Sequence, residues 1–185
     1  MPFRLSKKEV YEKWGINVDP VFKINSLSSK QQVIINNYIN SFPVFNERKI
    51  GLTIISEDFD FDSLIVAMCI ADKLFDKIHT AIRVLNISSI IIEYQRYNTS
   101  EEATIQLNNA IMTGDIVILN EISPVKYLEQ QKLVILHIIN MLISNRKPFI
   151  ITSNTPMKDM SDNLGSVIMK LISTYTIGMD IKIRS

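Results

Sequence analysis

Residues 51–75 constrain the fold of this chain more than any other segment. The run from Leu52 to Ile55 is apolar and β-branched, as in a buried strand, and after a short connection a helical apolar pattern begins. The residues on that helical stripe are Leu64, Ile65, Met68, Cys69, Ala71, Leu74 and Phe75. A strand, a short loop and a helix N-terminus form the scaffold of phosphate-binding loops, because backbone N–H groups and the helix dipole converge there on an anion.

The phosphate-loop pattern G-x-x-x-x-G-K-[ST] can be laid over residues 56–63, but only its last position is kept. Ser56 and Phe61 replace the two glycines, Asp62 replaces the lysine, and only Ser63 fits. The loop also carries four carboxylates, on Glu57, Asp58, Asp60 and Asp62. Two unit charges about 4 Å apart repel by roughly 4 kcal/mol at an effective dielectric near 20, so these side chains oppose a bound triphosphate. We therefore interpret the loop as a nucleotide-loop scaffold that no longer binds nucleotide.

The loop has two other interpretations, an ordinary turn, which stays open, and a calcium loop, which its residues disfavour. An ordinary strand-to-helix turn would contain the same residues, since Asp60 or Asp62 can cap the helix. A calcium loop would begin with the same spaced aspartates, but it then needs glycine and glutamate where this chain has Ser63 and Cys69. We therefore expect no calcium site.

Length, charge and cysteine content narrow the class of protein. A chain of 185 residues suits one domain with a real core, and its net charge of +1 excludes a broadly basic nucleic-acid binder. Cys69 is the single cysteine, so disulfides and cysteine zinc clusters are excluded, as expected in a reducing cytoplasm. His79 and His137 lack partners at metal-ligand spacing. With no signal peptide and no apolar run of 18 residues, we expect a soluble cytoplasmic protein without metal or membrane.

The rest of the chain alternates predicted strands with predicted helices. Strands are predicted over 50–55, 80–85, 115–120, 148–153 and 176–183, and helices over 28–42, 88–97, 99–112, 124–144 and 162–173. The helix after residue 28 is expected to end before Pro43, and Pro124 is expected to open the long helix. This alternation indicates an α/β fold with a parallel sheet flanked by helices.

Residues 1–19 are predicted to be an N-terminal extension with a short amphipathic helix, and residues 20–185 to be the folded domain. Tyr11 and Trp14 are candidate partner-binding residues, although Trp14 is more readily explained by packing back on the domain.

Three predicted strands end in polar residues that belong to one kind of site. The first runs into the acidic loop, the 115–120 strand ends in Asn120 and Glu121, and the 148–153 strand is followed by Asn154. In open α/β sheets, ligands bind beyond the carboxyl ends of the strands. An Asp-Glu strand end would hold magnesium and activate water, and a polar residue on the neighbouring strand would sense a γ-phosphate. Here the magnesium position is Asn120, a neutral and poor ligand for a hard cation.

With these motifs in view, the chain resembles the bacterial replicative-helicase loaders of the DnaC/DnaI type, which are AAA+ ATPases related to the IstB transposition helper. The resemblance runs from about Asp19 to the C-terminus, through the segments DPVFKINSLSS, YINSFP, GLTIIS, GDIVILNEI, NRKPFIITSNTP and LGSVIMKLISTYTIGMDIKIRS. It implies an AAA+-like, P-loop NTPase-type domain and a role near the replication machinery.

The departures from that family concern its chemistry. The Walker A lysine and glycines are missing, and the Walker B strand ends in Asn-Glu. Only Lys170 is found where the family places its trans-acting arginine, and we expect no separate N-terminal domain of the family's kind before the AAA+-like part. The resemblance therefore implies the fold but argues against ATP hydrolysis.

We accordingly predict a catalytically inactive primosome protein, from a phage or mobile element, that contacts a replicative helicase or its loader. It would be an adaptor, a minimal loader or a loader-mimicking inhibitor. We expect it to need no cofactor, and it could also form homo-oligomers. One alternative is a divergent ATPase that uses ATP and magnesium through Ser63, Glu121 and Asn154. The other is a single-stranded DNA-binding module, although a solvated charged surface explains its residues better. Its track would consist of Lys126, Arg146, Lys147, Lys158, Lys170, Lys182 and Arg184, with Tyr94, Arg96 and Tyr97 for stacking.

Overall fold

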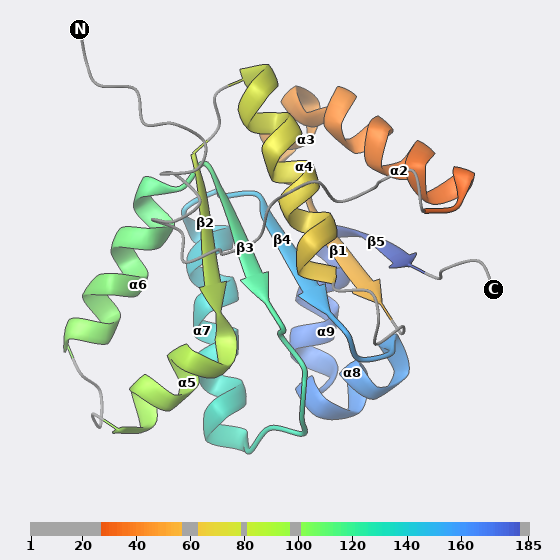
Figure 1. Cartoon of the computed structure of the whole chain (residues 1–185). Coiled ribbons are helices and arrows are strands. Elements are labelled where there is room, and N and C mark those ends of the chain that lie inside the picture. The colour runs from red at the N-terminus through yellow and green to blue at the C-terminus, as the bar shows by residue number, and fades with distance from the viewer. Residues whose placement is uncertain (1–26, 57–62, 79–80, 97–100, 182–185) are drawn as a thin grey trace, which may run out of the picture.

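A five-stranded parallel sheet forms the centre of the molecule (Figure 1). The computed structural model describes residues 27–56, 63–78, 81–96 and 101–181. Its strands are β1 (Gly51–Ser56), β2 (Ile82–Asn86), β3 (Ile116–Asn120), β4 (Phe149–Ser153) and β5 (Thr176–Ile181). Their spatial order is β2-β3-β4-β1-β5, and every neighbouring pair is parallel. The predicted parallel α/β sheet is therefore confirmed.

Helices cover both faces of this sheet (Figure 1). They are α2 (Ser29–Asn40), α3 (Phe42–Arg48), α4 (Ser63–Ile78), α5 (Ile87–Arg96), α6 (Glu101–Thr113), α7 (Glu129–Ser144), α8 (Met157–Leu164) and α9 (Ser166–Tyr175). Helices α2, α3 and α4 pack with Ile54 and Ile118 on one face, and α5 to α9 pack with Ile55 and Leu119 on the other. Because successive strand residues alternate between two buried faces, the central strands read as continuous apolar runs.

The sequence predicts one helix over residues 28–42 that ends before Pro43. In the structure Pro43 instead lies in the first turn of a second helix. Helix α2 ends at Asn40, and after Ser41 a separate helix α3 begins at Phe42. Proline is tolerated there because the first-turn N–H groups have no partner within the helix. The start of α2 was predicted correctly, since Ser28 and Gln31 form a reciprocal capping box.

The long helix begins five residues later than predicted, at Glu129 rather than Pro124. The Tyr127 side chain is buried against the core, which holds the preceding segment in a non-helical path. The sequence predicts an apolar stripe on this helix that includes Leu128, Leu133, Leu136, Ile139, Met141 and Leu142. Leu128 and Leu133 are, however, 69% and 63% exposed. Ile139 and Leu142 lie on the buried face as predicted, together with Ile135 and Ile138.

The helix predicted over residues 162–173 is two helices, α8 and α9, separated by Gly165. Gly165 has a φ of 83°, a conformation that glycine adopts without steric cost. The chain therefore turns at this residue instead of continuing one helix.

Several predictions concern residues outside the described ones. These are the short helix within residues 1–19, the acidic loop at 57–62, His79, Tyr97, Lys182 and Arg184. Within the described part of the chain, no helix is both long and apolar enough to cross a bilayer.

The hydroxyl group of Tyr38 gives a prediction about stability and pH. Tyr38 is buried beside Phe42 and Phe45, and its hydroxyl has no hydrogen-bond partner among the described residues. Because an unpaired buried hydroxyl is costly, Tyr38→Phe should match the stability of the wild type or exceed it by about 1 kcal/mol.

Burial also raises the pKa of Tyr38 well above its usual range. Above about pH 10 the unfolded chain would ionise this tyrosine while the folded chain keeps it neutral, so folding stability falls as pH rises. Urea unfolding at pH 8 and pH 11 should show a smaller loss for Tyr38→Phe than for the wild type. An equal loss in both proteins would contradict this assignment.

Candidate functional site

The candidate site lies at the carboxyl edge of the sheet. Strand β4 lies between β1 and β3, so the residues that follow these three strands meet at one edge. Ser63 begins α4 at the same edge, because α4 follows β1. The predicted site residues Ser56, Ser63, Asn120, Glu121 and Asn154 therefore all lie at this edge of the sheet.

Ser63 and Asn154 contact each other directly, although 91 residues separate them. The Asn154 Oδ1 atom accepts a hydrogen bond from the Ser63 hydroxyl at 2.9 Å and another from the Ser63 backbone N–H at 3.3 Å. Ser63 is fully buried and Asn154 is half-buried. An amide oxygen of the chain itself therefore caps the first turn of α4, where a phosphate-binding loop would present N–H groups to its ligand.

Asn120 is held by a second buried pair. The Thr152 hydroxyl donates to Asn120 Oδ1 at 2.8 Å and accepts from the Glu121 backbone N–H at 3.2 Å. The backbone N–H of Ile122 donates to the Thr152 carbonyl oxygen at 3.1 Å. Thr152 is fully buried, so these bonds fix the end of β3 against β4 in a dry environment.

Glu121 follows Asn120 in a left-handed backbone conformation, with a φ of 51°. Burial raises the pKa of the Tyr127 hydroxyl, the Ser88 side chain beside it acts in the opposite direction, and the charge of Glu121 raises it further. The Glu121 carboxylate therefore lies within electrostatic reach of Tyr127, which belongs to the core on the α5–α9 face of the sheet.

The side chain at the magnesium position is a poor ligand for that ion. The Asn120 oxygen is neutral and already accepts a hydrogen bond, whereas Mg²⁺ prefers carboxylate oxygens and water. The Ser63 hydroxyl is directed to Asn154. Among residues 27–56, 63–78, 81–96 and 101–181, no group of three or more His, Cys, Asp or Glu side chains is placed to hold a metal.

Several residues that order this edge were not singled out from the sequence. Thr155 donates its hydroxyl to the Ser123 carbonyl oxygen at 2.6 Å, and the Asn163 amide donates to the same oxygen at 3.3 Å. These bonds tie the segment before α8 and the last turn of α8 to the loop after β3. Thr152 itself lay inside an apolar run, and only its position beside the strand end could have indicated it.

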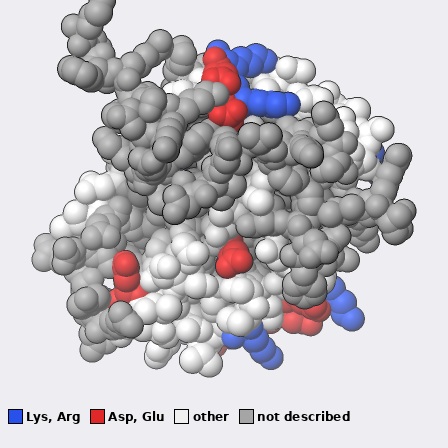
Figure 2. Space-filling model, in the orientation of Figure 1, with Lys and Arg blue, Asp and Glu red and all other residues white. Residues whose placement is uncertain are grey.

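The candidate DNA-binding residues that the structure describes do not form one track. Arg146 and Lys147 precede β4 and Lys158 follows it, and a five-residue strand spans roughly 16 Å, so they lie at opposite edges of the sheet. Lys170 lies on α9. On the face shown in Figure 2, the basic side chains of the described residues lie near the margins and form no continuous patch. Phe61, Asp62, Arg184, Tyr11 and Trp14 lie outside the described residues.

Comparison with solved structures assigns the fold. No protein-family model matches the chain, and no curated protein matches its sequence. The DnaC helicase loader matches 92% of this chain and 99% of its own, with a TM-score of 0.72 and 16% identity. DnaI matches 88% and 92%, with a TM-score of 0.71 and 14% identity. The replication initiator DnaA, bound to AMPPCP and single-stranded DNA, matches 98% of this chain and 52% of its own, with a TM-score of 0.66 and 12% identity.

The fold is thus an AAA+-like α/β fold of the P-loop type. More particularly, it is the fold of the DnaC and DnaI helicase loaders, and the resemblance noted in the sequence is confirmed at the level of the fold.

Proposed function

We propose that this protein is a catalytically inactive AAA+-like protein that acts in DNA replication by contacting a replicative helicase or a helicase-loader subunit. The pairing of Ser63 with Asn154 carries the proposal. A residue at the γ-phosphate-sensing position here accepts hydrogen bonds from the helix start that would otherwise hold the phosphates. The site therefore satisfies its own hydrogen-bonding groups.

Electrostatics supports the same conclusion. The sequence places four acidic residues and no lysine in the loop before Ser63, and the magnesium position is a hydrogen-bonded amide. Restoring nucleotide binding would require breaking the bonds of Ser63 and Asn120 as well as overcoming the repulsion between carboxylates and phosphates.

The fold supports a setting in DNA replication, because the matched structures include a helicase loader and a replication initiator. AAA+-like proteins use the edge of the sheet that binds nucleotide as an interface between subunits. Where that edge no longer binds nucleotide, its surface stays available for binding a partner protein without a nucleotide cycle. The partner is then a helicase or a loader subunit, and the protein serves as an adaptor, a minimal loader or an inhibitor that mimics a loader subunit.

Apolar side chains border this edge where a partner could bury them. Val125 and Leu128 lie in the loop that leads from Glu121 to α7, and they are 58% and 69% exposed. Buried apolar anchors carry much of the affinity in protein interfaces. We therefore assign this loop to the contact with the helicase or loader subunit.

The corresponding experiment replaces both side chains with aspartate. The Val125→Asp, Leu128→Asp variant should bind the purified replicative helicase or loader of its host at least about tenfold more weakly, because two charges would have to be desolvated in the interface. Surface-plasmon resonance without nucleotide measures this change. Met112→Asp is the matched control, since Met112 is 62% exposed at the far end of α6 and should leave binding unchanged. Equal affinities for the two variants would refute the assignment of the loop, and no binding by the wild type would refute the proposed function.

A further inference from the structure

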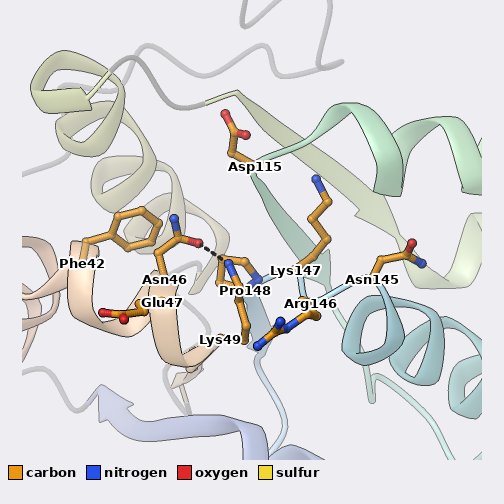
Figure 3. Close-up of a pocket in the computed structure, with 9 residues that line it drawn as sticks. All are labelled: Phe42, Asn46, Glu47, Lys49, Asp115, Asn145, Arg146, Lys147 and Pro148. Carbon is orange, nitrogen blue, oxygen red and sulfur yellow. Dashed lines mark hydrogen bonds between the residues drawn. The ribbon is translucent and has the colours of Figure 1, made fainter.

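A cleft of about 710 Å³ opens at the amino edge of the sheet, opposite the candidate site (Figure 3). It lies between the end of α3, the end of α7 and the starts of β3 and β4. Its lining includes three cationic side chains, Lys49, Arg146 and Lys147, and two acidic ones, Glu47 and Asp115. A cavity of this size is in the range that holds a small ligand or part of a larger one.

Two of the lining residues adopt a backbone conformation that normally favours glycine. Lys49 has a φ of 58° at the end of α3, and Arg146 has a φ of 54° after α7. Helices commonly end in this conformation with a glycine, because a side chain there is strained. At both helix ends that face this cleft, the chain therefore has a strained cation where glycine would fold more easily.

The helix ends do not need these cations to satisfy their carbonyl groups. The Phe45 carbonyl oxygen accepts from the Ile50 backbone N–H at 2.9 Å, and the Leu142 carbonyl oxygen accepts from the Lys147 backbone N–H at 2.9 Å. Both ends are closed by main-chain hydrogen bonds, and at the end of α7 the Asn145 side chain also donates to the Met141 carbonyl oxygen at 2.8 Å.

Two of the charged side chains that line the cleft form hydrogen bonds with backbone groups. Lys147 Nζ donates to the Gly114 carbonyl oxygen at 2.8 Å, and Asp115 Oδ2 accepts from the Ala81 N–H at 2.8 Å. These bonds hold the edge of the cleft in place but leave little capacity for a ligand.

The other two cations remain uncompensated. Lys49 Nζ contacts only a neutral acceptor among the described residues, Asn46 Oδ1 at 3.3 Å, and the Arg146 guanidinium has no hydrogen-bond partner in that part of the chain. Figure 3 shows Arg146 pointing toward Lys49, while the Glu47 carboxylate points away from both.

We propose that this cleft binds a phosphate group between Lys49 and Arg146. A doubly charged phosphate can engage two cations, one of them through the planar fork of arginine, whereas a single carboxylate needs only one. The phosphate belongs either to a small ligand such as a nucleotide or to a nucleic-acid backbone. The site is independent of the proposed function, because it shares no residue with the carboxyl edge.

Calorimetric titration with inorganic phosphate at constant ionic strength tests the proposal in the wild type, Arg146→Gln and Arg146→Gly. Both variants should bind at least tenfold more weakly than the wild type. Without ligand, Arg146→Gly should melt about 2–4 °C higher, since glycine relieves the positive-φ strain. Lys158→Gln, which removes an exposed cation from α8, should bind like the wild type.

Further titrations separate the two sources of phosphate. Tighter binding of an oligothymidylate than of ATP, with a steep salt dependence, assigns the site to a nucleic-acid backbone. Equal or tighter binding of ATP assigns it to a small ligand. Equal phosphate affinity in the wild type and Arg146→Gln, no phosphate binding by the wild type, or binding of an acidic peptide alone would overturn the proposal.

Discussion

Gly51→Ala is expected to destabilise the fold by about 3 kcal/mol or more, because it forces a side chain into backbone. Gly51 begins β1, which lies between β4 and β5 in the sheet. A Cβ atom added at Gly51 would overlap the backbone carbonyl oxygen of Phe149. That oxygen belongs to the first residue of β4, so it can move only if the central strand pair shifts as well.

Urea unfolding monitored by circular dichroism measures this change, with Gly178→Ala as the matched control. Gly178 also lies in a strand, β5, but a Cβ atom there would meet nothing within 4 Å. The control should differ from the wild type by less than about 1 kcal/mol. If the two variants had similar stability, the close approach of β1 and β4 would be incorrect.

Thr152→Val should cost about 2–4 kcal/mol, because it leaves two buried polar groups without their partner. The substitution nearly preserves the shape of the side chain but removes the hydroxyl that donates to Asn120 Oδ1 and accepts from the Glu121 N–H. Both bonds lie at the end of β3, so the loss should appear first as local opening of that strand end.

Amide hydrogen exchange and urea unfolding together measure the effect, and Thr53→Val serves as its control. Thr53 is equally buried, but among the described residues its hydroxyl bonds only to that of Thr176, which also donates to the Ile172 carbonyl oxygen. We expect a cost of about 1 kcal/mol for the control, since one hydrogen bond is lost. Faster exchange at Glu121 in Thr152→Val alone would support the account, and unchanged exchange there would contradict it.

The strands could be predicted because their amino-acid composition is typical of one kind of element, a strand that is buried on both faces of a sheet. The segments that became β1, β3 and β4 are short, apolar and β-branched, and a strand buried on both faces requires that composition. Because parallel strands end at one edge, the sequence also placed Asn120 and Asn154 near the start of α4.

Helix boundaries were less predictable where tertiary contacts decide them. Pro124 is a good first residue for a helix, yet burial of Tyr127 delays the start of α7 to Glu129. Pro43 is equally compatible with a helix end and a helix start, and only the packing of Phe42 selects the second. Local sequence cannot distinguish these outcomes.

The pairing within the candidate site could not be predicted either. Sequence analysis identified Ser63 and Asn154 separately, but nothing in the sequence indicates that the oxygen of one accepts from the other. The role of Thr152 could not be predicted, because a threonine in a β-branched run is typical of any strand. The two cations with positive φ, Lys49 and Arg146, carry no local signal of that conformation.

Calorimetric titration of ATP with magnesium tests the central claim most directly. It should be made in the Lys49→Gln, Arg146→Gln double variant, so that the amino-edge cleft contributes no heat. We predict no binding up to millimolar ATP, because Asn154 occupies the hydrogen-bonding groups at the start of α4 and Asn120 cannot hold magnesium. Micromolar binding that Ser63→Ala abolishes would show that the site still takes nucleotide and would contradict the account.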